Sequence, residues 1–80
     1  MSDYDKLDAL LVDRINTANG ATFLEMEHAS AISLEAHMLA ERFKRNAYRV
    51  IDGRLQSLRK RGVIRFDRPV WRLAKDAEAR

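Results

Sequence analysis

One stretch of the chain, residues 46–61, carries side chains that can hydrogen-bond to a nucleic acid. Successive helical residues are separated by about 100°, so spacing assigns each one to a face. With Ile51 turned to the core, the opposite face presents Arg49, Gly53, Gln56 and Lys60, and Asn46, Asp52 and Ser57 flank it. Arg matches guanine O6 and N7, Gln and Asn match adenine N6 and N7, and cations bind phosphates. This face could therefore contact base edges or phosphates, and Asp52 is its only acid.

The other face of the same stretch is apolar and predicts a helix over residues 46–61. Its stripe is Ala47, Tyr48, Ile51, Leu55 and Leu58. Asn46 is a favourable N-cap, and Gly62 is a favourable helix stop. Gly53 lies inside the helix, where it costs roughly 1 kcal/mol relative to Ala. Gly53 either allows close approach to a partner, packs closely within the protein, or is simply tolerated.

The spacing of apolar residues changes from helical to alternating after Gly62, and the new spacing predicts a short hairpin over residues 63–73. Apolar and polar residues alternate in 63–66 and again in 70–73, with the turn composition Asp67-Arg68-Pro69 between them. The buried face is expected to hold Ile64, Phe66, Trp71 and Leu73. We interpret Trp71 as a core residue, although an aromatic ring could also stack on a base. Because an isolated hairpin is not stable, these strands must pack on helices.

The first half of the chain predicts helices over residues 2–18, 22–30 and 34–44. Their expected N-caps are Ser2, Thr22 in a capping box with Glu25, and Ser33. Gly20 ends the first helix. The residues expected to face the core are Tyr4, Leu7, Leu11, Ile15 and Ala18 in the first helix, and Leu34, Met38, Leu39 and Phe43 in the third. Residues 74–80 are charged and are expected to form a frayed tail.

The segment RLQSLRKRGVIRFDRPVWRL, residues 54–73, resembles the end of a winged helix-turn-helix domain. Leu55 and Leu58 match the core leucines of the recognition helix in that family, residues 59–61 match its basic end, and Gly62 matches its stop. The resemblance implies one mostly α domain over residues 1–80 with a C-terminal β-hairpin: three or four helices plus a two-stranded wing, as in small bacterial or phage proteins. The wing turn is short, and either 22–30 or 34–44 could be the positioning helix.

The resemblance also implies a function, which is sequence-specific binding of double-stranded DNA in transcription regulation. The N-terminal part of the recognition helix would approach the bases in the major groove. Base contacts are then expected from Asn46, Arg49, Gly53, Gln56 and Ser57, and phosphate contacts from Lys44, Arg45, Lys60, Arg65 and Arg68. Alternatives are a protein-interaction module, and RNA or non-specific nucleic-acid binding through the same basic face. The basic residues at the helix end could also only complement the helix dipole. A homodimer through helix 2–18 would read a near-palindromic site.

Charge is distributed unevenly along the 80 residues, although the net charge is only +3. Residues 1–41 hold eight acids and two bases, a net charge of −6, whereas residues 42–80 hold thirteen bases and four acids, a net charge of +9. This asymmetry favours a polyanion as the partner of the basic half, with the acidic helices facing away. The alternative is a solvated basic surface with the acidic half packed against it.

Several classes of protein are not expected from this composition. The chain has no Cys, no apolar run long enough to span a membrane, and no basic leader followed by an apolar stretch. We therefore expect a cytoplasmic protein without a membrane partner. His37 with Glu41, and Glu25 with His28, supply only two ligands each, so no metal is expected. No nucleophile–base pair or phosphate loop is present, so we expect neither an enzyme nor a small-molecule cofactor.

Overall fold

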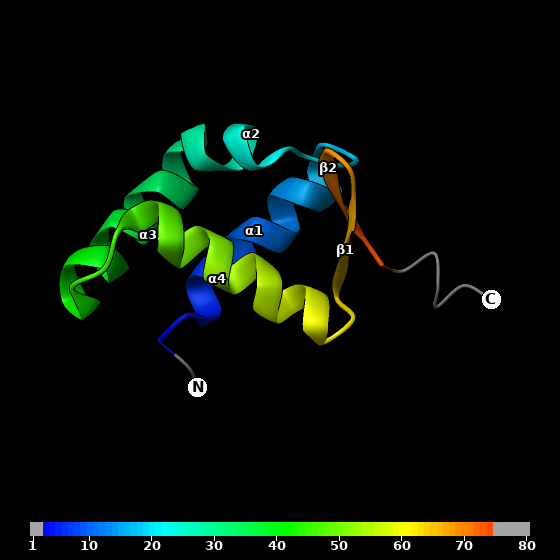
Figure 1. Ribbon diagram of the computed structural model, residues 1–80. Helices are drawn as coiled ribbons and strands as arrows, with labels where there is room; N and C mark the ends of the chain where they lie inside the picture. Colours follow the sequence, from blue (N-terminus) through cyan, green and yellow to red (C-terminus); the bar gives the residue numbers. More distant parts are fainter. Residues whose placement is uncertain (1–2, 75–80) are drawn as a thin grey trace.

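Four helices followed by a two-stranded antiparallel sheet form residues 3–74, the part of the chain that this computed structural model describes (Figure 1). The elements are α1 (Asp5–Thr17), α2 (Phe23–His28), α3 (Ser30–Phe43), α4 (Ala47–Lys60), β1 (Ile64–Asp67) and β2 (Val70–Leu73). The prediction of a mostly helical chain with a C-terminal hairpin is confirmed. None of the described helices has the length and apolar character that crossing a membrane requires.

Two predicted helix starts are confirmed by their caps. The Thr22 side chain accepts a hydrogen bond from the Glu25 backbone N–H at 3.1 Å, and Glu25 Oε1 accepts one from the Thr22 N–H at 2.8 Å. This reciprocal capping box fixes the start of α2. Asn46 Oδ1 accepts from the Tyr48 N–H at 2.9 Å and starts α4 at Ala47, in agreement with the predicted helix 46–61.

Two other helix starts were predicted wrongly. The first helix begins at Asp5 rather than at residue 2, and its N-cap residue Tyr4 makes no side-chain capping bond. The third begins at Ser30, so the proposed cap Ser33 lies inside α3. A single residue, Ala29, separates α2 from α3. Its backbone is extended, with a ψ of 126°, and this one non-helical residue changes the direction of the chain. A cap-type residue near a helix start is therefore not always the cap.

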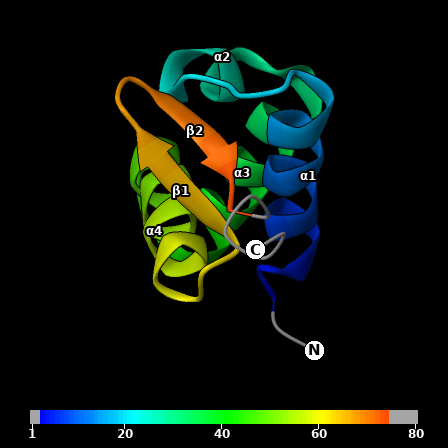
Figure 2. The same ribbon diagram turned by 90° about the vertical axis from the view of Figure 1, so that its right-hand side faces the viewer.

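The helices and the hairpin enclose one apolar core. α1, α3 and α4 pack on one another, β2 contacts α1, and β1 contacts α4. Figure 2 shows the hairpin lying across one side of this helical layer. The fully buried side chains come from nearly every element: Leu7, Leu11, Ile15, Met26, Ile32, Ile51, Leu55 and Ile64. In α1 the predicted Leu7, Leu11 and Ile15 are confirmed in this core, as is the stripe predicted for residues 51–58 of α4.

Five apolar residues predicted to face the core are exposed instead, and one of them, Ala18, lies directly after the last residue of α1. Leu34 and Met38 are 66% and 56% exposed on α3, where the buried stripe runs through Ile32, Ala36, Leu39 and Ala40. Tyr48 is 53% exposed and Phe66 is 46% exposed. Val50, which the prediction left out, is buried in α4. The buried side of α4 is thus shifted from Ile51 toward Val50, away from Tyr48.

The hairpin is tight and is joined to the helices by a bridge. Asp67 pairs with Val70, so the turn consists only of Arg68 and Pro69, one residue shorter than predicted. Trp71 also exchanges two backbone hydrogen bonds with Ala21, of 2.8 and 3.0 Å. This isolated bridge ties β2 to the connection between α1 and α2.

Gly20, next to that bridge, has a structural reason to be glycine. Its φ is +112°, and a Cβ there would lie 2.8 Å from a Val70 side-chain carbon. Both the backbone conformation and the close approach of β2 exclude a side chain. Of the predicted tail, residues 75–80 lie outside the described residues, and the Ala74 N–H donates to the Val63 carbonyl at 3.1 Å.

Candidate nucleic-acid interface

The outer face of α4 carries the polar residues that the sequence places there. Asn46, Arg49, Gly53 and Lys60 are exposed, and Gln56 and Ser57 are half-buried. The fold therefore brings the predicted base-contacting residues together on one helical surface. Asn46 is already used in part, because its Oδ1 caps the helix; its amide nitrogen and the second lone pair of Oδ1 remain for a partner.

Gly53 lies at the open surface of this face. A Cβ added at this position would meet no atom within 4 Å. This finding rules out close packing within the described chain as the reason for the glycine. The two remaining explanations are close approach of a partner and simple tolerance.

Gln56 is oriented by a neighbour on the same helix. Arg59 Nε donates to Gln56 Oε1 at 3.1 Å. The Gln56 amide nitrogen keeps both of its N–H groups for an external acceptor, and Oε1 retains a second lone pair. Arg59 thus limits the orientations that Gln56 can present.

Several basic side chains near α4 have no acidic partner. Within residues 3–74, ion pairs are absent for Lys44, Arg45, Arg49, Lys60 and Arg68. All five were predicted to contact DNA, as was Arg65, which is exposed on β1. Arg45 and Arg49 line a hollow of about 210 Å³ beside Gly53, together with Tyr4, Val50 and Arg54. This hollow has no acidic lining residue among those described, so it suits an anion such as a phosphate.

Two other arginines of the basic half are committed to a buried carboxylate. Arg54 donates from Nε and Nη2 to the two carboxylate oxygens of Asp8, each at 2.9 Å. Arg61 Nη2 donates to Asp8 Oδ2 at 3.2 Å. The Arg54 guanidinium also lies 4.6 Å from the centre of the Tyr4 ring. The hydrogen bond to Asp8 raises the pKa of Arg54, against the opposing effect of burial, so Arg54 stays charged.

This cluster was not predicted from the sequence, although a signal was present. Arg54 follows Val50 and Ile51 by four and three residues, respectively, so it lies close to the buried stripe of α4. Asp8 precedes the buried Leu11 by three residues, so it also lies close to the buried stripe of α1. An arginine at a half-buried position needs a carboxylate, because an unpaired charge away from water is costly.

The expected separation of charge is accordingly incomplete. Asp8 and Asp3 belong to the acidic half, yet Asp8 binds Arg54 and Arg61, and Asp3 lies 3.5 Å from Arg42. The prediction that the acidic helices face away from the basic half is wrong at these positions. The unpaired cations remain concentrated around α4 and at the hairpin turn.

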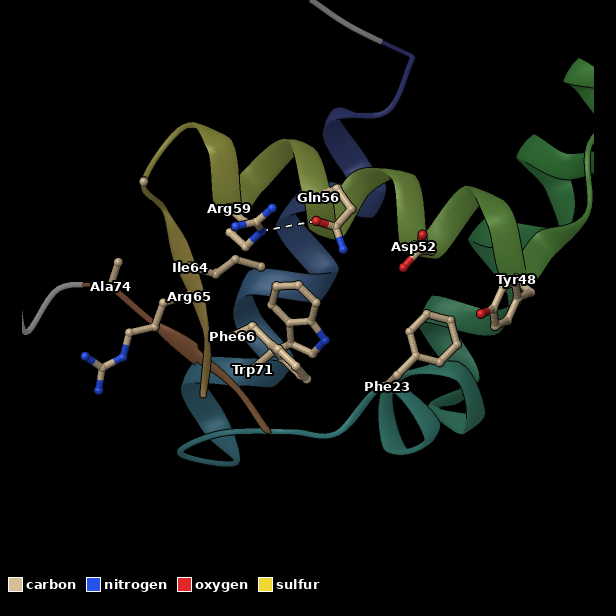
Figure 3. A pocket seen from close by; sticks show the side chains of 11 residues that line it. Phe23, Tyr48, Asp52, Gln56, Arg59, Ile64, Arg65, Phe66, Trp71 and Ala74 are labelled. Carbon is tan, nitrogen blue, oxygen red and sulfur yellow. Dashed lines mark hydrogen bonds between the residues drawn. The ribbon is translucent and has the colours of Figure 1, made fainter. Parts of the chain in front are cut away.

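A second feature of this region is a groove between α4, the hairpin and α2 (Figure 3). Its volume is about 860 Å³, and its aromatic lining comes from Phe23, Tyr48, Phe66 and Trp71. Trp71 is buried, as predicted, and forms part of the wall. The sequence did not predict the groove, because it placed Tyr48 and Phe66 in the core.

Comparisons with protein-family models, with curated proteins and with solved structures found no match to this chain. Within the described range, no cluster of three or more His, Asp and Glu side chains is placed to hold a metal ion. What the interface can do must therefore be argued from its own surface chemistry.

Proposed function

We propose that this protein binds double-stranded DNA with sequence specificity through the outer face of α4, as a small transcription regulator of the winged helix-turn-helix type. The observation that carries the proposal is the concentration of unpaired cations around an open helical face. Arg45 and Arg49 flank Gly53, and Lys60 follows on the same face. A duplex offers both the phosphates and the base edges that such a face can bind.

The arrangement of the elements supports the same proposal. α3 packs on α4, and only residues 44–46 connect them, which is the short connection of a helix-turn-helix. In this proposal α3 is the positioning helix and α4 is the recognition helix. The hairpin follows α4 directly, and its two-residue turn carries Arg68 to the tip.

The residues divide by the kind of contact that their positions allow. Arg49 and Gln56 lie on the outer face of α4 and would contact bases, with Asn46 and Ser57 at the edges of that face. Lys44, Arg45, Lys60, Arg65 and Arg68 lie around this face and would contact phosphates, which supply affinity without sequence choice. Arg54 and Arg61 are not part of the interface, because Asp8 holds both of them.

The test is selection of a duplex from a random library, followed by fluorescence anisotropy across a salt series. We expect log K to fall linearly with log salt, with roughly four to six phosphates neutralised. Lys60→Ala should reduce the slope by about 1. Arg14→Ala is the matched control, because Arg14 is an exposed arginine on α1 that makes no ion pair with a described residue. Absence of binding to any duplex at ~50 mM salt would refute the proposal.

A second candidate function, docking of another protein, is favoured by one observation. Leu34 and Met38 are exposed one turn apart on α3 and form an apolar patch. The described part of α1 has no large apolar residue as exposed as these, so a homodimer through α1 has less support. Sedimentation of wild type and Met38→Lys tests the case in which the docked protein is a second copy of this chain, and a monomer in both cases excludes self-association through α3.

A further inference from the structure

The groove between α4 and the hairpin has aromatic rings on its walls. Tyr48 packs on Phe23 with ring centres 5.0 Å apart, and Phe66 packs on Trp71 at 4.8 Å. Tyr48 and Phe66, the outer member of each pair, are each about half exposed. The inner member holds the outer ring in place, so each pair presents an aromatic surface to solvent at low conformational cost.

Polar groups without partners lie between the two aromatic pairs. The Asp52 carboxylate and the Trp71 indole N–H make no hydrogen bond to any residue in 3–74. Figure 3 shows the indole nitrogen facing the space between Trp71 and Phe23. The Gln56 amide N–H groups also remain uncommitted, since only its oxygen is bonded to Arg59. The groove thus offers one acceptor group and two donor groups beside its rings.

This combination does not suit a purely apolar peptide side chain, which would leave Asp52 and Gln56 unsatisfied. It suits a nucleobase, which has an aromatic face for stacking and an edge of donors and acceptors. Arg59 stands at the groove with its terminal nitrogens unbonded to any described residue, where a phosphate of the same nucleotide could bind. A groove volume of about 860 Å³ is ample for a nucleotide.

We propose that the groove lined by Tyr48, Asp52, Gln56, Phe66 and Trp71 binds an unpaired nucleotide of a single-stranded nucleic acid, with cytosine preferred over thymine or uracil. The base stacks on an exposed aromatic ring, and the Asp52 carboxylate accepts from the exocyclic amino group. Cytosine N4 is such a donor, whereas thymine presents its O4 acceptor at the corresponding position. Trp71 and Gln56 can donate to the remaining base acceptors.

Of the groove residues, Gln56 and Arg65 also belong to the proposed duplex interface, whereas Tyr48, Asp52, Phe66 and Trp71 do not. Arg49 and Gly53 line the hollow on the other side of α4 and are not groove residues. The unpaired base would therefore lie beside the outer face of α4, next to Gln56. Failure of either site leaves the other testable.

The chain has one tryptophan, Trp71, so its fluorescence reports on the groove directly. We would titrate the full chain with the ten-residue oligonucleotides dC10 and dT10 and with their ribose counterparts C10 and U10. Tryptophan fluorescence should change on binding, and the cytosine oligonucleotides should bind more tightly than dT10 or U10. The deoxy and ribo arms share the base and phosphate chemistry, and the tighter arm identifies the natural source.

Variants separate this site from other modes of binding. Tyr48→Leu and Phe66→Leu keep apolar bulk but remove the ring, and each should weaken binding of dC10 by about tenfold. Met38→Ala is the matched control, since Met38 is equally exposed but lies on α3, outside the groove. Asp52→Ala should abolish the preference for cytosine, and Arg49→Ala should leave the fluorescence change intact.

Two results would overturn the proposal. One is the absence of any fluorescence change with all four oligonucleotides while circular dichroism shows a folded protein. The other is unchanged dC10 binding by both ring-removal variants together with loss in Arg49→Ala, which would place the oligonucleotide on the outer face of α4.

Discussion

Arg49 and Arg54 are five residues apart on α4, and their surroundings are opposite. Arg54 is held by both oxygens of Asp8 and lies over the Tyr4 ring. Arg49 is exposed and makes no ion pair with a described residue. The difference follows from the helical face alone, since Arg54 borders the buried stripe and Arg49 does not. A count of basic residues in a helix therefore overstates what is free to bind a ligand.

The two positions also differ in what each charge contributes to stability. The Asp8 side chain is 13% exposed and that of Arg54 is 20% exposed, so water screens this pair less than a surface pair. Its geometry is bidentate, and Arg61 adds a further hydrogen bond to the same carboxylate. The cluster joins Asp8 of α1 to Arg54 in the middle of α4 and to Arg61 directly after its last residue. Arg49 makes no such link to any residue in 3–74, and its charge is left for a partner.

The change with the largest expected effect is Asp8→Ala. It leaves Arg54 partly buried without its carboxylate, and removes three charge-assisted hydrogen bonds at once. We expect a loss of about 3 kcal/mol in the free energy of unfolding, measured by urea denaturation. Asp13→Ala is the control, because Asp13 is an exposed acid of α1 without a described ion pair, and it should change stability by less than ~0.5 kcal/mol. Equal effects of the two variants would show that the cluster contributes little.

A double comparison on α4 sharpens the contrast. Arg49→Ala should lower affinity for the selected duplex by about 1–3 kcal/mol, the value of a good base contact, and leave stability unchanged. Arg54→Ala should instead lower the free energy of unfolding and, at temperatures where the variant is folded, leave the affinity for the duplex nearly unchanged. Anisotropy and denaturation of both variants check this crossing pattern. If Arg49→Ala bound the duplex like wild type, its proposed role would be wrong.

Local patterns in the sequence predict much of this fold. The capping box at Thr22, the cap at Asn46 and the stop at Gly62 depend on neighbouring residues only, and all three occur as predicted. The stripe of Leu7, Leu11 and Ile15 follows from helical periodicity in the same way. These features need no knowledge of which element packs on which.

Features that depend on tertiary packing were predicted poorly. Leu34 and Tyr48 occupy plausible core positions on their own helices, but the neighbouring elements cover a different face of each. The partner of Arg54 is 46 residues away in the sequence, so no local pattern names Asp8. The groove is missed for the same reason, since it forms only where Phe66 and Tyr48 extend past the core.

The smallest expected effect is at Gly53, which lies between Arg49 and Arg54 on α4, and it tests whether a partner approaches the helix closely there. Gly53→Ala adds a methyl group that meets no atom of the described chain, and alanine is the better helix former, so stability should rise by about 0.5–1 kcal/mol. If the duplex approaches the backbone between Arg49 and Lys60, the same methyl group should weaken binding several-fold. Gly62→Ala is the control for the substitution itself, because its φ of +78° makes alanine destabilising there. A Gly53→Ala protein that is more stable and binds the duplex as tightly as wild type would show that this glycine is only tolerated, and that the helix does not approach its partner closely at this turn.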